Sequence, residues 1–165
     1  MIVIIIAVLE KTNVLKKKLE AEISKYPFKD LIKIVSYDEN EYSDILLIDE
    51  NMSLFKSDFS CNLCVLCLPI SIEGLKARSV VSCGMLLKDS VTLSSIGEEK
   101  AMLCLQRNVD FFGVILQPFE KSIPFDRSLS IYRNVSIAFL LLLLGEYYLK
   151  ENEKTAAFDE SASFA

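Results

Sequence analysis

The sequence predicts an α/β fold: a Rossmann-like, mainly parallel sheet, an antiparallel extension over about residues 90–120, and a long C-terminal helix. Three observations indicate this class. β-branched runs alternate with an amphipathic stretch early in the chain, short apolar runs punctuated by glycine follow, and a leucine-rich stretch comes last. With 165 residues, 52% of them hydrophobic, the chain can bury one core. We expect a single domain over residues 1–150 and a flexible tail over residues 151–165.

The first part of the chain predicts buried parallel strands. Residues 2–8 form a β-branched run without a basic leader, so we interpret them as a strand and not as a signal peptide. Leu15, Leu19 and Ile23 recur at helical spacing and predict an amphipathic helix that ends at Pro27. Further strands are expected at residues 31–36, 44–48, 63–68 and 80–83.

After Gly84 the pattern changes to short apolar segments separated by glycines. We favour antiparallel strands at residues 91–96, 101–106 and 114–117. Residues 98–111 are also compatible with a helix, and the sequence alone leaves both interpretations open. An antiparallel extension of a parallel sheet is a common mixed arrangement.

The C-terminal helix is predicted over residues 127–150, with Asp126 as its N-cap. The consecutive leucines at residues 140–144 put apolar side chains on every side of this helix, and such a helix must be covered all round. One side can lie on the sheet, and we expect a second copy of the chain to cover the other. The predicted homodimer interface comprises Ile131, Val135, Phe139, Leu142, Leu143 and Tyr147.

Composition excludes several kinds of site. The sequence contains no histidine, which excludes Ser-His and Cys-His nucleophile pairs and mixed Cys/His zinc sites. The net charge is −5, and the longest basic block is residues 16–18, which argues against a nucleic-acid partner. The apolar run at residues 137–144 is far shorter than the roughly 20 residues of a membrane span. We name no catalytic residues, expect no cofactor or membrane partner, and leave open whether the chain is an enzyme.

The five cysteines are interpreted as reduced thiols of a cytoplasmic protein, because their number is odd and no secretory context accompanies them. Cys61, Cys64 and Cys67 resemble the start of a bacterial ferredoxin cluster motif, but Leu68 and Pro69 follow where the motif has another cysteine. The intervening residues suit a strand, on which Cys64 would face the opposite side from Cys61 and Cys67. We expect these cysteines to be packed in the core and predict no metal site.

Residues 44–53, DILLIDENMS, resemble the strand that carries the phosphoacceptor aspartate in response-regulator receiver domains. The resemblance would give that role to Asp49. Receivers also have an acidic pair at the end of the first strand, where this chain has only Glu10. They place a helix between the second and third strands, and residues 37–43 are too few for a full helix. We therefore carry over none of the receiver residues.

The best candidate for a ligand site lies around Gly84, at the end of a predicted strand. Neither G-x-G-x-x-G nor a P-loop occurs in the sequence, but ligands of α/β sheets commonly bind at strand ends. Donors suited to a carboxylate or phosphate follow nearby. The proposed ligand-binding residues are Ser82, Gly84, Lys88, Ser94, Ser95, Gln106 and Arg107. In the alternative interpretation the serines line a solvated strand face, and Arg107 covers apolar surface with its stem.

Two functions follow from the sequence. The first is association, mainly as a homo-oligomer through the C-terminal helix, because that helix is apolar on all sides and no complete catalytic set accompanies it. The alternative is a domain that binds a small anionic ligand or a nucleotide in a pocket at residues 82–107.

Overall fold

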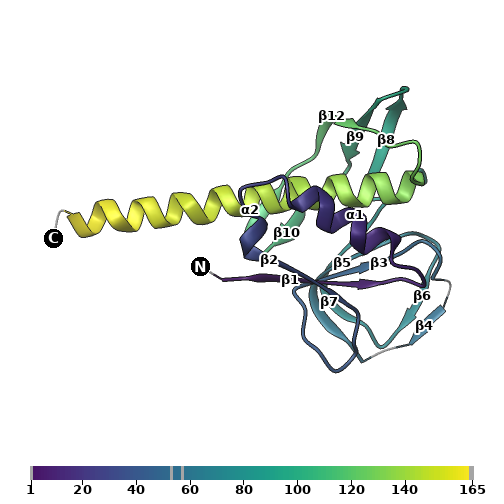
Figure 1. Ribbon diagram of the computed structural model, residues 1–165, viewed down its shortest axis with the longest axis horizontal. Helices are drawn as coiled ribbons and strands as arrows, with labels where there is room; N and C mark the ends of the chain where they lie inside the picture. Colours follow the sequence, from purple (N-terminus) through teal and green to yellow (C-terminus); the bar gives the residue numbers. More distant parts are fainter. Residues whose placement is uncertain (1, 53, 57, 164–165) are drawn as a thin grey trace.

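The computed structural model describes residues 2–52, 54–56 and 58–163 and has a mixed α/β architecture (Figure 1). A five-stranded sheet forms its base, in the order β2-β1-β3-β5-β7. Every neighbouring pair in this sheet is parallel, as predicted. The strands are β1 (Ile4–Leu9), β2 (Ile32–Ser36), β3 (Ile45–Ile48), β5 (Ser60–Leu66) and β7 (Lys76–Ser82).

The two faces of the parallel sheet are covered by different kinds of structure. Helices α1 (Val14–Ile23) and α2 (Ile131–Ser163) pack on one face (Figure 1). Ile45 and Leu47 point to the helices, whereas Leu46 and Ile48 point to the other face, because successive side chains of a strand alternate. A single-turn helix, η1 (Lys29–Leu31), precedes β2.

The second face is covered by connections and by a short parallel pair, β4 (Leu54–Lys56) and β6 (Ser71–Glu73). Among the described residues, α1 is the only α-helix between consecutive strands of the parallel sheet. The predicted absence of a full helix between the second and third strands is confirmed: residues 37–44 form a connection with turns.

An antiparallel extension is present where the sequence predicts it. Strands β8 (Val91–Ile96), β9 (Lys100–Leu105) and β12 (Phe119–Pro124) form a three-stranded sheet in the order β12-β9-β8. A separate hairpin contains β10 (Val109–Phe111) and β11 (Val114–Leu116). Residues 98–111 are therefore turn and strand rather than helix. A bridge between Cys83 and Val91 joins the extension to the parallel sheet.

The C-terminal helix starts and ends later than the sequence predicts. Asp126 is not its N-cap: the Asp126 carboxylate accepts hydrogen bonds from the backbone and hydroxyl of Ser128, within the preceding turn. The Ser130 hydroxyl instead accepts a hydrogen bond from the Arg133 backbone at 3.2 Å, so the helix begins at Ile131. The helix continues beyond Lys150 to Ser163 and projects from the body of the molecule (Figure 1). Flexibility of residues 151–165 stays a prediction.

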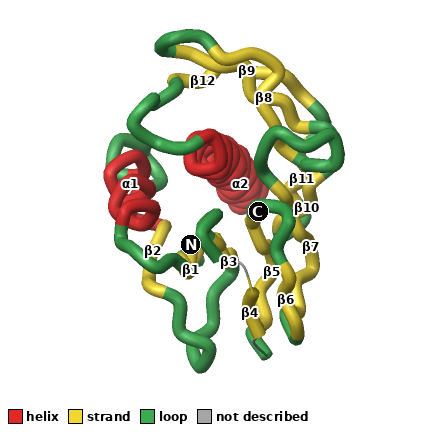
Figure 2. The backbone as a smooth tube through the Cα atoms, turned by 90° about the vertical axis from the view of Figure 1, so that its right-hand side faces the viewer, coloured by secondary structure: helices red, strands yellow, loops and turns green. Residues whose placement is uncertain are grey.

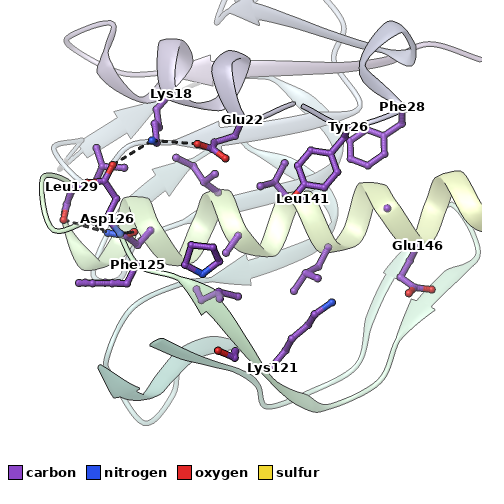
Figure 3. Close-up of a pocket in the computed structure, with 18 of the residues that line it drawn as sticks. Lys18, Glu22, Tyr26, Phe28, Lys121, Phe125, Asp126, Leu129, Leu141 and Glu146 are labelled. Carbon is purple, nitrogen blue, oxygen red and sulfur yellow. Dashed lines mark hydrogen bonds and ion pairs between the residues drawn. The ribbon is translucent and has the colours of Figure 1, made fainter. Parts of the chain in front are cut away.

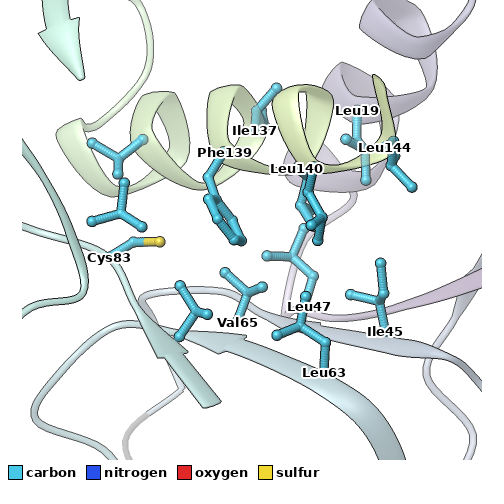
Figure 4. Packing of buried hydrophobic residues seen from close by; sticks show 14 of the residues in the cluster. Leu19, Ile45, Leu47, Leu63, Val65, Cys83, Ile137, Phe139, Leu140 and Leu144 are labelled. Carbon is cyan, nitrogen blue, oxygen red and sulfur yellow. The ribbon is translucent and has the colours of Figure 1, made fainter. Parts of the chain in front are cut away.

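The leucine-rich part of α2 is covered mainly by its own chain. Leu140, Leu143 and Leu144 are fully buried in the core between α2 and the parallel sheet. Figure 4 shows Phe139 and Leu140 pointing toward Leu47 and Val65 of that sheet. The other leucines of the run, Leu141 and Leu142, are only partly buried.

Candidate functional site

A groove with a volume of about 880 Å³ runs along the partly buried flank of α2 (Figure 3). Helix α2 forms its floor, α1 with the following segment to Phe28 forms one wall, and β12 forms the other. Figure 2, which looks along α2, shows α1 and β12 flanking this helix. The volume lies within the range of ordinary ligand pockets, about 300–1,000 Å³.

The floor of the groove is apolar because of helical periodicity. Since Leu140, Leu143 and Leu144 point into the core, the residues between them are rotated toward the groove. The floor consists mainly of Ile137, Ala138, Leu141, Leu142, Gly145 and Leu149, and Asn134, Glu146 and Tyr148 of the same helix also line the groove. Leu149, at the outer end of this floor, is 54% exposed.

One end of the groove is closed by an ion pair. The Lys18 ammonium on α1 lies 3.2 Å from the Asp126 carboxylate in the segment before α2, and 3.2 Å from Glu22. Hydrogen bonds to Glu22 and Asp126 raise the pKa of Lys18. Hydrogen bonds from Ser128, and then from Lys18, lower the pKa of Asp126. These contacts connect α1 to the segment between β12 and α2 at this end of the groove (Figure 3).

The predicted ligand residues near Gly84 mostly surround one loop, residues 84–90. Gln106 donates its amide hydrogen to the Asp89 carbonyl at 3.0 Å, and Arg107 donates to the Lys88 carbonyl at 2.9 Å. These donors therefore hold the loop in place. A Cβ at Gly84 would lie 2.7 Å from the Asp89 carboxylate, so the close approach of Asp89 accounts for this glycine.

The predicted serines of this segment do not share one site. Ser82 and Ser90 exchange hydrogen bonds, with the Ser90 backbone donating to the Ser82 hydroxyl at 3.1 Å. Ser94 and Ser95 lie farther along β8 and are exposed. Anion binding by residues 82–107 stays a prediction, since the contacts of Ser82, Gln106 and Arg107 are all made within the chain.

The carboxyl end of β3 is filled by the first turn of α2. Arg133 donates two hydrogen bonds to Asp49, at 3.1 and 2.9 Å, and the hydrogen bonds raise the pKa of Arg133. The buried Tyr132 hydroxyl donates to the Ile48 carbonyl, and burial raises the pKa of this phenol. Asp49 is 1% exposed, so it lacks the access that a phosphoacceptor needs.

The cysteines on β5 pack in the core, but their placement differs from the prediction. Cys61 and Cys64 share the face away from the helices, and Cys67 packs on the helical side. The backbone amides of Asn62 and Leu63 both donate to the Asp44 carbonyl, at 3.0 and 3.1 Å. This irregularity shifts the alternation of side chains by one residue.

The thiols have the properties of buried groups. Burial raises the pKa of Cys61 to about 11 and raises that of Cys83 well above its ordinary value. Within the part of the chain that the structure describes, no cluster of three or more potential ligands is arranged to hold a metal ion. All five cysteines are free.

The predicted dimer residues on α2 fall in two environments. Val135, Phe139 and Leu143 are fully buried against the sheet of the same chain, with no exposed surface for a partner. Leu142 lines the groove, and Ile131 and Tyr147 are partly buried. The sequence did not indicate the groove, because its walls come from segments distant in the chain.

No helix in the described ranges is both long and apolar enough for a membrane span. Comparisons with protein-family models, curated proteins and solved structures give no match for this chain. The geometry of the chain therefore carries the functional argument.

Proposed function

We propose that this protein is a non-catalytic binding protein that holds an apolar partner in the groove between α1, α2 and β12. The observation that carries this proposal is the floor of the groove: Leu141 and Leu142 are only partly buried and Leu149 is exposed, on a helix whose opposite flank is fully buried. Contiguous exposed apolar surface of this kind commonly marks an interaction site. Burying it would contribute roughly 25 cal/mol for each Å² removed from water.

The floor and walls of the groove are connected by packing and by an ion pair. Its floor belongs to a helix anchored in the core, and the Lys18–Asp126 ion pair links α1 to the segment that leads into α2. A preformed site loses less conformational freedom on binding than a mobile one. This arrangement supports a role in recognition.

Other features support binding rather than catalysis. A reactive thiol needs a lowered pKa, and burial raises the pKa of Cys61, Cys64 and Cys83. In the groove, the carboxylates of Glu22 and Asp126 are engaged by Lys18. These groups act as structural contacts.

Gly145 provides a direct test of the groove. A Cβ at this position would meet only Phe28, at an ordinary contact distance of 3.9 Å, so a larger side chain can enter the groove without backbone strain. We expect the folded protein to bind the apolar fluorescent probe 1-anilinonaphthalene-8-sulfonate. Gly145→Phe should weaken this binding about tenfold or more, whereas Gly145→Ala should retain it.

The measurement is a fluorescence titration of the folded protein, with circular dichroism to verify folding. Both variants remove the helical glycine, which costs about 0.5–1 kcal/mol of helix stability relative to alanine. Neither is therefore expected to weaken the helix, and their difference in probe binding reports occupation of the groove. A wild-type protein that leaves the probe unbound, or a Gly145→Phe variant that binds it like wild type, would contradict the proposal.

The homodimer through α2 stays a competing proposal. The open flank with Leu142 and Leu149 favours it, whereas the concave shape of the groove argues against it, because two concave surfaces leave voids when they face each other. Sedimentation velocity at low micromolar concentration distinguishes the two. A dimer that Gly145→Phe dissociates would support self-association, and a monomer would leave the groove for another partner.

The strand order and the free thiols each support a further proposal. We propose that the parallel sheet is Rossmann-like with reduced crossovers, because its order, β2-β1-β3-β5-β7, corresponds to a common doubly wound arrangement. The usual ligand edge of such a sheet is occupied here by Arg133 and Tyr132. We also propose a cytoplasmic location, which the free thiols of all five cysteines support.

A further inference from the structure

The wall formed by β12 is the open edge of a sheet. Every residue from Lys121 to Pro124 lines the groove. Successive side chains of a strand point to opposite faces, so a cavity that contacts consecutive residues lies along the edge of the strand. In the sheet order β12-β9-β8, this is the edge of β12 that faces away from β9.

The direction of the backbone groups follows from the register. In an antiparallel pair, alternate residues direct both their N–H and C=O groups to the same neighbour. Phe125 donates its N–H to the Glu99 carbonyl at 2.8 Å, in register with the pairs Ile123–Ala101 and Lys121–Leu103. The residues between them, Glu120, Ser122 and Pro124, therefore direct their backbone groups away from β9. This leaves amides at positions 120 and 122 and carbonyls at positions 120, 122 and 124 along the open edge.

This edge and the floor together suit one kind of occupant. An extended peptide beside β12 would satisfy the backbone groups of the edge, and every second side chain would point to Leu141, Leu142 and their neighbours on α2. Addition of a strand to an open edge is an established mode of peptide recognition. A compact apolar ligand would leave the backbone groups of β12 without partners.

Within the described residues, the groove lining carries unpaired charges of both signs, and one of them lies on the β12 wall. Lys18 is engaged by Glu22 and Asp126, and Arg127 donates to the carbonyls of Gly97 and Glu98. The Lys121 ammonium has no carboxylate within ion-pair distance among the described residues. Two carboxylates, Glu98 and Glu146, line the groove without a cation within that distance in the same part of the chain. Lys121 lies on the β12 wall (Figure 3), so an acidic side chain on the partner strand would pair with it.

The opposite wall limits the occupant to a single segment. If β12 of a second copy paired with this edge, its β9 would follow at the next strand spacing of about 4.8 Å. That position is on the side occupied by α1, which bounds the groove opposite β12. A lone extended segment avoids this conflict.

We propose that the groove binds an extended peptide segment of a partner protein as an added strand on β12, with alternate apolar side chains on the floor and an acidic side chain near Lys121. This inference rests on the proposed function and specifies the partner. Pro124, which lacks an N–H, limits the length of edge that is open to pairing and so restricts uncontrolled strand addition.

Position 122 allows a matched pair of variants. Ser122→Pro removes an N–H that points to the groove and leaves the pairing with β9 intact. The strand already accommodates a proline at position 124, whose backbone nitrogen also faces away from β9. Ser122→Ala keeps the N–H and removes only the hydroxyl. The probe is an acetylated, fluorescein-labelled octapeptide that alternates threonine with valine or leucine and carries one glutamate at an apolar-face position.

We expect the octapeptide to bind the wild-type protein and Ser122→Ala with similar affinity. It should bind Ser122→Pro with an affinity that is lower by about tenfold or more, as the loss of backbone hydrogen bonding implies. Two N-methylated peptides, each blocking one alternate set of amides, provide a second test on wild-type protein. One should lose binding and the other retain it, which keeps the test decisive if Ser122→Pro does not fold.

Equal binding of the octapeptide by Ser122→Pro and wild type would overturn strand addition, as would equal binding of both N-methylated peptides. Failure of the octapeptide to bind at 1 mM, while 1-anilinonaphthalene-8-sulfonate still binds and Gly145→Phe blocks it, would overturn the inference and leave the proposed function standing. If neither the octapeptide nor 1-anilinonaphthalene-8-sulfonate binds the wild-type protein, the proposed function itself is contradicted.

Discussion

At the scale of single residues, contacts between distant segments decide roles that the sequence pattern leaves ambiguous. Asp49 was recognisable as an acid after a buried strand, but its partner Arg133 is far away in the chain, so the ion pair was not predictable. Cys61 was predicted on the opposite face from Cys64 but shares its face, because one irregular pair of hydrogen bonds to Asp44 shifts the alternation. Periodicity arguments do not detect an irregularity of this kind.

The Arg133–Asp49 pair should contribute strongly to stability. Asp49 is almost fully buried, so Arg133→Met would leave an uncompensated charge and should lower the free energy of unfolding by about 3–5 kcal/mol. The double variant Asp49→Asn/Arg133→Met should recover part of this loss. Urea denaturation of the single and double variants measures both effects. A single variant with unchanged stability would show that the pair has no structural role.

At the scale of elements, the sequence predicted the parallel strands, the first helix and the antiparallel extension. Local sequence patterns did not decide whether residues 98–111 form a helix or strands. Pairing of β9 with both β8 and β12 decides in favour of strand, because each supplies backbone hydrogen bonds that a helix would form internally. The start of α2 was misplaced because Asp126 closes a turn and Ser130 caps the helix.

Helix α1 should depend on Glu10, the residue that the receiver comparison singled out. Its carboxylate accepts hydrogen bonds from the backbone amides of Leu15 and Lys16, at 2.9 and 2.8 Å, and interacts favourably with the positive end of the helix. Glu10→Ala should destabilise the protein by about 1 kcal/mol. Thr12→Ala is the control, since the Thr12 hydroxyl makes only long contacts, donating to the Glu10 carboxylate at 3.4 Å and accepting from the Val14 amide at 3.5 Å. Equal thermal shifts for the two variants would count against this cap.

At the scale of the whole molecule, the sequence identified α2 as the central element but not how it is covered. Hydrophobic character on all sides predicted the need for a second cover. In the structure the parallel sheet covers Phe139, Leu140 and Leu143, and the remaining flank forms the floor of the groove. The candidate site was missed because α1, α2 and β12 meet only through long-range packing.

The central claim is that partners bind along α2, and amide chemical-shift mapping by NMR locates binding most directly. On titration with 1-anilinonaphthalene-8-sulfonate, we expect the largest shifts at residues 137–149 of α2 and at residues 121–125, which comprise the end of β12 and the residue after it. Shifts concentrated instead in the loop at residues 84–90, with α2 and β12 unaffected, would contradict it and return the candidate site to the segment that the sequence favoured.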